Sequence, residues 1–170
     1  MVAINNMGLK RIAAGLLAAA WLLAAPLAAQ AQDKAVDDLM AQANKAMQKG
    51  QPRDAENLLR KAIDAAPNRS DLYALRARAR DSSGKFDAAL EDANKYIELE
   101  PKDAYGYLTR SRIYISLDKP EMALADANKA IELEPNEPDG YYRRSDIYRE
   151  MNKDSEAKAD EKKAEALEKR

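Results

Sequence analysis

The five residues Ile-Glu-Leu-Glu-Pro occupy positions 97–101 and occur again at positions 131–135, an offset of 34. A weaker copy, Ile-Asp-Ala-Ala-Pro, occupies positions 63–67 at the same offset. Self-similarity at a constant period of a few tens of residues indicates copies of one supersecondary unit that stack against one another. The sequence therefore predicts a repeat protein.

Three further columns of residues keep the spacing of 34. They are Tyr73, Tyr107 and Tyr141; Ala55, Ala89, Ala123 and Ala157; and Gly50, Gly84, Asp118 and Asn152. Gly, Asp and Asn are the residues that best tolerate left-handed backbone at the end of a helix. Apolar residues recur at helical spacing between these positions, and no strand pattern competes. The pattern therefore predicts that each unit comprises a helix, a tight turn, a second helix and a turn marked by proline.

The helix ends follow from the same signals. Pro52 and Pro120 stand at the start of second helices, and Pro138 stands near the start of a first helix, where a missing N–H costs little. We expect helix pairs at 33–49 and 52–66, 70–83 and 86–99, 104–117 and 120–133, and 138–151 and 154–168.

Over residues 36–170 the chain resembles tetratricopeptide-repeat (TPR) proteins, of an exported bacterial type. The resemblance rests on the alanine and tyrosine columns and on three further sets. The turn prolines are Pro67, Pro101 and Pro135, and the two helix columns are Leu59, Ala93 and Ala127, and Ala62, Tyr96 and Ala130. It implies an all-α fold, a right-handed superhelical stack of about four antiparallel helix pairs with a concave groove. The implied repeats are about 36–69, 70–103, 104–137 and 138–170, with the last helix as a cap.

The N-terminus has the pattern of a secretory signal peptide. Lys10 and Arg11 precede an uncharged apolar stretch, and a small-x-small motif ends at Ala31. We expect residues 1–31 to be cleaved off after Ala31, leaving 32–170 as a TPR domain in the periplasm or secreted, with no membrane insertion. The alternative is an uncleaved leader that anchors the repeats as a subunit of an inner-membrane or secretion assembly.

The composition of the 170 residues excludes several functions. There is no cysteine and no histidine, so disulfides, thiolate chemistry, the commonest general base and the commonest transition-metal ligand are all missing. The carboxylates show no spacing that would converge on a metal ion. We expect no catalytic residues, no cofactor and no metal. A net charge of −1 argues against nucleic acid as the partner.

Two charged columns also keep the repeat spacing. Arginine occupies three first helices and aspartate the three following helices: Arg76, Arg110 and Arg144; Asp92, Asp126 and Asp160. The first repeat lacks both, with Gln42 and Leu58 at those positions. A guanidinium in a helix–helix seam requires a carboxylate partner. We expect structural ion pairs within each repeat; the alternative is pairing across repeats, Asp92 with Arg110 and Asp126 with Arg144.

The TPR resemblance also assigns an inner face to the groove. The partner-binding residues that it implies are Met40, Asn44, Met47, Arg78, Tyr105, Leu108, Arg112, Ile115, Tyr142, Asp146 and Arg149. Tyr105, Leu108 and Ile115 would form a clustered apolar strip, which marks an interface if it is exposed. The two methionines can equally cover the core.

Arg78 and Arg112 are the candidates for an anion-binding stripe on this face. Neutralisation within the chain by Asp81, Asp146 or Glu150 is the alternative for both arginines. Their role therefore depends on which carboxylates lie beside them.

Chaperone-binding members of the family hold a C-terminal carboxylate with Lys, Asn and Arg side chains. Asn44 matches one of these positions, but Met40, Leu75, Tyr105 and Thr109 occupy the others. That carboxylate clamp is not carried over. The resemblance instead implies a noncatalytic protein-interaction or scaffold module of the cell envelope, which holds a peptide or a partner helix in its groove or joins subunits through its ends or outer helices.

Overall fold

The computed structural model describes residues 30–169. The expected leader, apart from its last two residues, lies outside the described residues, and its cleavage stays a prediction. The chain divides into two units, residues 1–38 and 39–170, and the fold below is that of the second unit. None of the helices in the described part is both long and apolar enough to span a membrane.

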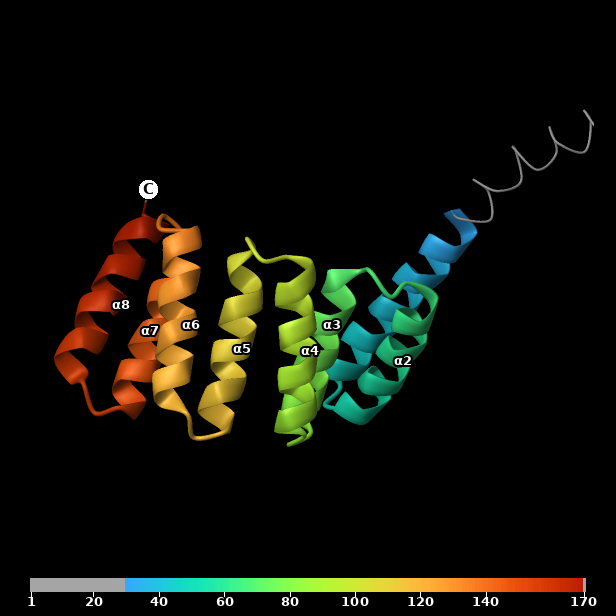
Figure 1. Cartoon of the computed structure of the whole chain (residues 1–170), viewed down its shortest axis with the longest axis horizontal. Helices are drawn as coiled ribbons and strands as arrows, with labels where there is room; N and C mark the ends of the chain where they lie inside the picture. The colour runs from blue at the N-terminus through green and yellow to red at the C-terminus, as the bar shows by residue number, and fades with distance from the viewer. Residues whose placement is uncertain (1–29, 170) are drawn as a thin grey trace, which may run out of the picture. The chain divides into compact units, whose positions relative to one another are not determined.

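Every regular element between residues 30 and 169 is an α-helix (Figure 1). A helix over 30–48 is followed by α2 (Pro52–Ala65), α3 (Ser70–Ser82), α4 (Phe86–Leu99), α5 (Ala104–Ser116), α6 (Pro120–Leu133), α7 (Pro138–Glu150) and α8 (Asp154–Glu168). The ends of α2 to α8 lie within one residue of those expected from the sequence. The all-α, superhelical stack of antiparallel helix pairs is confirmed.

A left-handed residue closes each tight turn inside a repeat. The four φ angles are +69° at Gly50, +73° at Gly84, +56° at Asp118 and +58° at Asn152. The N–H of the next residue then donates to a carbonyl five positions earlier: Gln51 to Ala46, Lys85 to Arg80, Lys119 to Tyr114 and Lys153 to Tyr148, at 2.8–2.9 Å. This hydrogen bond satisfies a carbonyl that the helix end leaves unpaired. The expected left-handed column is therefore confirmed.

The tyrosine column fixes the turn between repeats. Each hydroxyl donates to the carbonyl oxygen of the turn proline six residues earlier: Tyr73 to Pro67 at 2.8 Å, Tyr107 to Pro101 at 3.1 Å, and Tyr141 to Pro135 at 3.1 Å. The hydroxyl thereby ties the start of each first helix to the turn that precedes it. The same contact in every turn keeps the spacing between repeats constant.

The core lies between and within the helix pairs. The alanine column is completely buried, because small side chains let paired helices approach closely. Larger apolar residues fill the remaining space, as where Ile113 packs with Ala77, Ala89 and Ala93. The first helices of successive repeats, α3, α5 and α7, lie side by side. Their exposed faces form one continuous surface, on which the candidate site lies.

Helix α8 has a neighbour on one side only. It buries Ala157, Ala164 and Leu167 against the preceding helices, while most of its other positions are charged and exposed. This one-sided pattern is what a terminal repeat needs to meet water.

Candidate functional site

The arginine and aspartate columns form pairs inside each repeat. Arg76 donates to Asp92 at 2.9 and 2.7 Å, Arg110 to Asp126 at 2.8 and 2.8 Å, and Arg144 to Asp160 at 2.7 and 2.8 Å, in each case through Nε and Nη2. The three aspartates are only 3–7% exposed. The alternative, Asp92 paired with Arg110 and Asp126 paired with Arg144, does not occur in the described part of the chain.

The contact across repeats that this alternative expected from aspartate is made by asparagine. Nη1 of Arg110 donates to Oδ1 of Asn94 at 2.8 Å, and Nη1 of Arg144 donates to Oδ1 of Asn128 at 2.7 Å. Each of these arginines therefore bridges its own repeat and the preceding one. Asn94 and Asn128 also keep the spacing of 34, which is the sequence signal for this role.

Tyrosine rings complete the surroundings of the paired arginines. The Cζ atom of Arg110 lies 5.7 Å from the ring centre of Tyr107 and 5.9 Å from that of Tyr114. The hydrogen bonds that Arg110 donates to Asp126 raise the pKa of Arg110 above its ordinary value, although burial opposes this. Because each of its three nitrogens is already bonded within the chain, Arg110 is a structural residue.

In the second repeat an arginine takes the place of one of the tyrosines beside the buried ion pair. Arg80 stands at the position of Tyr114 in the next repeat and lies 2.9 Å from Asp92 and 3.2 Å from Glu56. Glu56 also pairs with Lys85 at 2.7 Å. This network was not predictable from the repeat pattern, because Arg80 and Glu56 belong to no repeated column.

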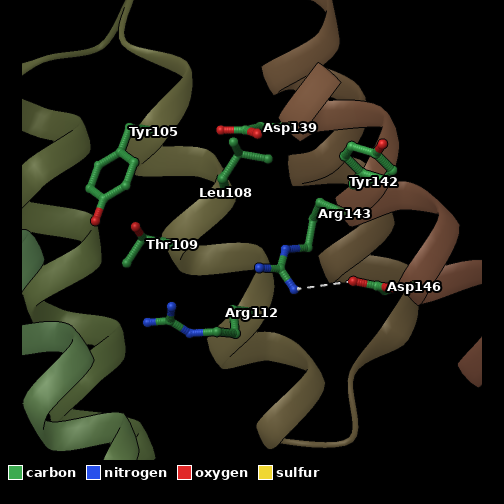
Figure 2. Close-up of a pocket in the computed structure, with 8 residues that line it drawn as sticks. All are labelled: Tyr105, Leu108, Thr109, Arg112, Asp139, Tyr142, Arg143 and Asp146. Atoms are coloured by element: carbon green, nitrogen blue, oxygen red, sulfur yellow. Dashed lines mark ion pairs between the residues drawn. The ribbon is translucent and has the colours of Figure 1, made fainter. Parts of the chain in front are cut away.

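A hollow of about 290 Å³ opens between α5 and α7 on the surface of the first helices (Figure 2). Its lining comprises Tyr105, Leu108, Thr109, Arg112, Asp139, Tyr142, Arg143 and Asp146. A second hollow, of about 310 Å³, shares Arg112, Arg143 and Asp146 with the first and adds Ile115, Ser116, Ile147, Arg149 and Glu150. The two hollows gather the residues that the TPR resemblance assigns to the groove in the third and fourth repeats.

The other residues assigned to the groove lie elsewhere. Met40, Asn44, Met47 and Arg78 belong to neither hollow. Met40 is half-buried, and its sulfur accepts a long contact of 3.8 Å from Nη2 of Arg69. Arg78 is exposed and forms no ion pair within residues 30–169. The site that the structure brings together is therefore confined to α5 and α7.

The apolar part of this site is only partly covered. Tyr105 is 42% exposed and meets the ring of Tyr96 edge-on, with ring centres 5.9 Å apart. Leu108 and Ile115 are half-buried. Of the apolar strip expected from the sequence, Tyr105 is thus exposed and the other two residues are partly covered.

Arg112 is neutralised from within the chain. Its Nε lies 3.1 Å from Oδ2 of Asp81 on α3, and Asp81 also accepts a hydrogen bond of 3.0 Å from Ser116. Of the carboxylates considered from the sequence, Asp81 is therefore the one that pairs with Arg112.

Arg143 is the residue of this site that the sequence analysis missed. Its Nε is buried and has no hydrogen-bond partner in the described part of the chain, and its Nη1 lies 3.9 Å from Asp146. Burial, and then the positive charge of Arg112, lower the pKa of Arg143 below its ordinary value. The equivalent positions of the preceding repeats hold Leu75 and Thr109, so no column marked it.

The side chains of this lining suit noncovalent binding. The lining offers guanidinium donors, carboxylates and apolar side chains, and no group of three or more potential metal-ligating side chains converges anywhere in residues 30–169. Such a surface can hold a polypeptide by hydrogen bonds and apolar contacts.

Comparison with known proteins places this geometry in a family. Two family models, both described as tetratricopeptide repeat, match residues 46–113 and 104–137, which together are more than half of the chain. A rice protein (Oryza sativa subsp. japonica), described as protein SGT1 homolog, is 40% identical over 67 residues, which are 39% of this chain and 18% of that protein. The match thus covers less than a fifth of the rice protein.

Solved structures show the same fold. TTC0263, described as a thermophilic TPR protein of Thermus thermophilus, is 22% identical with a TM-score of 0.74, over 79% of this chain and 75% of that one. MamA is 23% identical with a TM-score of 0.67, over 82% of both chains. The first TPR domain of Spaghetti (RPAP3), bound to the HSP90 peptide SRMEEVD, is 27% identical with a TM-score of 0.63, over 70% of this chain and 94% of that one.

The 34-residue period, the helix hairpins, the left-handed turn residues and the two family models all agree, and the chain belongs to the tetratricopeptide-repeat family.

Proposed function

We propose that this chain is a noncatalytic protein-binding module of the cell envelope, and that it holds an extended peptide or a partner helix against α5 and α7. The observation that carries the proposal is the partly exposed apolar strip of Tyr105, Leu108 and Ile115 beside two adjoining hollows. Apolar residues gathered at a concave polar rim favour a polypeptide partner.

A relative supports the peptide as partner. The first TPR domain of Spaghetti was solved with a bound peptide, and it covers 70% of this chain at 27% identity. Its peptide need not be the one bound here, because Met40, Leu75 and Thr109 replace clamp positions of chaperone-binding TPR proteins. The partner of this chain is therefore expected to differ from chaperone tails.

The signal-peptide pattern that ends at Ala31 supports a location in the periplasm or outside the cell. Retention of the leader as a membrane anchor is the second candidate. Trp21, the chain's only tryptophan, separates the two, because a chain cleaved after Ala31 lacks it. Mass spectrometry of protein purified from the cell envelope would read the mature N-terminus directly.

The binding mode is tested by crosslinking the full chain in the cell envelope and recovering its partner. We expect Leu108→Ala combined with Tyr105→Ala to lose most of the crosslinked partner. Met122→Ala is the matched control, because Met122 is 49% exposed on the second helix α6, away from both hollows. If Met122→Ala lost the partner and the double variant kept it, the chain would join subunits through its outer helices.

A further inference from the structure

We infer that the two hollows between α5 and α7 recognise a side-chain carboxylate of an extended partner peptide, and that Arg143 is the residue that binds it. The inference rests on the proposed function and names the chemistry of the partner. It follows from the incomplete hydrogen bonding of the Arg143 guanidinium, from the charges around it and from the two hollows that adjoin it.

Arg143 differs from the structural arginines in what its donors meet. Arg110 and Arg144 each place Nε and Nη2 on a buried carboxylate of their own repeat. The Nε of Arg143 is buried but has no acceptor in the described part of the chain, whereas buried donors in folded proteins are nearly always paired. The side chain as a whole is 29% exposed, so an acceptor from outside can reach this guanidinium, which its own chain leaves incompletely bonded.

The charges nearby leave Arg143 incompletely neutralised. Asp146 lies 3.9 Å from Arg143 but only 3.2 Å from Arg149. Arg112 adds a second positive charge, and its own carboxylate partner is Asp81 on α3. Asp146, Asp139 and Asp81 all act to raise the pKa of Arg143, but burial and the charge of Arg112 outweigh them. Figure 2 shows the Arg143 guanidinium extending toward α5 and the Arg112 guanidinium pointing away from α7. Of these two arginines, Arg143 is therefore the one that extends across the first hollow.

The lowered pKa of Arg143 is consistent with this role. Burial is its larger cause, and the charge of Arg112 is the next. An incoming carboxylate would offset both effects, since an opposite charge within hydrogen-bond distance favours the charged form.

The shape of the surface favours a side chain over a chain end. Arg143 and Arg112 line both hollows, so a peptide can continue in either direction from the point where it meets them. Leu108 flanks this point in the first hollow and Ile115 flanks it in the second. The partner is therefore an extended segment in which one Asp or Glu is flanked by apolar residues.

The test uses the full chain, either cleaved or with its leader as purified, and fluorescent peptides blocked at both ends. Each peptide carries a central Glu, or Gln in its place, flanked on both sides by Leu. We expect the Glu peptide to bind about tenfold more tightly than the Gln peptide, as measured by fluorescence anisotropy. Arg143→Gln should remove this preference. Arg60→Gln is the matched control, an exposed arginine of α2 outside both hollows, and should keep it.

A second measurement does not depend on whether the variant folds. The ¹⁵N–¹H signal of the Arg143 Nε should shift in the wild-type chain when the Glu peptide is added, and should stay nearly unchanged with the Gln peptide. Equal affinity for the two peptides, or an unmoved Nε signal on binding, would overturn the carboxylate assignment while leaving the groove as a binding surface.

Two other outcomes would contradict the inference. Binding that requires a free C-terminal carboxylate, with blocked peptides inactive, would overturn the side-chain assignment. Loss of the crosslinked envelope partner in Met122→Ala and not in the Tyr105/Leu108 double variant would overturn the proposed function itself, and the present inference with it.

Discussion

The guanidinium of Arg110 meets the carboxylate of Asp126 side-on, with Nε and Nη2 each 2.8 Å from one oxygen. The remaining Nη1 lies 2.8 Å from Oδ1 of Asn94 in the preceding repeat. One side chain therefore ties together the two helices of its own repeat and the repeat before it. The same arrangement around Arg144 makes this contact a repeated element of the stack.

Removing Asp126 should destabilise the stack strongly. Asp126→Ala would leave the half-buried Arg110 without its counter-charge, and loss of one partner from a buried pair costs about 3 kcal/mol or more. We expect the free energy of unfolding, measured by chemical denaturation followed by circular dichroism, to fall by about 3–5 kcal/mol.

The matched control for Asp126→Ala is an exposed ion pair on the same helix. Lys129 and Glu132 are 2.8 Å apart, with 69% of the Glu132 side chain exposed. Glu132→Ala should change the free energy of unfolding by less than about 0.5 kcal/mol. Equal effects of the two substitutions would contradict a structural role for the buried pair.

The repeated parts of this structure were predictable, because each copy confirms the others. The helix ends and the left-handed residue at Asp118 follow from one period applied along the chain. The position of Leu108 beside a hollow was expected from the TPR resemblance. The ion pairs were predictable as a set, and the expected pairing within each repeat is the one that the structure shows. The contacts of Arg110 and Arg144 with Asn94 and Asn128 of the preceding repeats were not predicted.

The parts that escaped prediction are those that occur once. Arg143 replaces Leu75 and Thr109 of the earlier repeats, so no column reveals that its Nε is buried and unpaired. Arg80 and Glu56 likewise form a network that one repeat interface has and the others lack. Their meeting is decided by side-chain packing across the interface, which a sequence period does not encode.

Gly106→Ala should lower stability, although Ala is the better helix former. A Cβ at Gly106 would lie 2.6 Å from Cδ1 of Tyr96 and 2.9 Å from Cγ1 of Ile97, which is closer than real contacts allow. Overpacking of this kind costs about 1–3 kcal/mol, more than the helix propensity of Ala returns. In a Tyr96→Ala background the Gly106→Ala change should cost clearly less; denaturant unfolding of the four chains of this double-mutant cycle measures the difference.

Asp118→Gly should raise stability. Asp118 holds a φ of +56°, where a side chain with a Cβ is strained by about 1 kcal/mol and glycine is not. We expect a gain of up to about 1 kcal/mol in the free energy of unfolding for Asp118→Gly, and a loss of similar size for Asp118→Ala. Thermal unfolding of the three chains checks the order Gly, Asp, Ala. An unchanged melting temperature across the series would contradict strain at this turn.

The Glu56 network should make stability depend on pH in the acid range. Burial tends to raise the pKa of Glu56, but hydrogen bonds from Lys85 and Arg80 outweigh it and hold the pKa below its ordinary value of 4.5. The folded state therefore favours the ionised carboxylate, and the stabilisation is present above about pH 4.5 and is lost as the pH falls below that value.

Glu56→Gln should be less stable than the wild-type chain by about 1–2 kcal/mol near neutral pH, because two charge-assisted hydrogen bonds are weakened. The difference should shrink as the pH is lowered through 4.5, since the wild-type carboxyl then becomes protonated and loses the same charge. Denaturant unfolding at several pH values measures it. Glu98→Gln, which removes an exposed carboxylate paired with Lys95, is the control and should show only a small difference throughout. A Glu56→Gln difference that stayed constant down to acid pH would mean that packing, and not charge, holds this side chain.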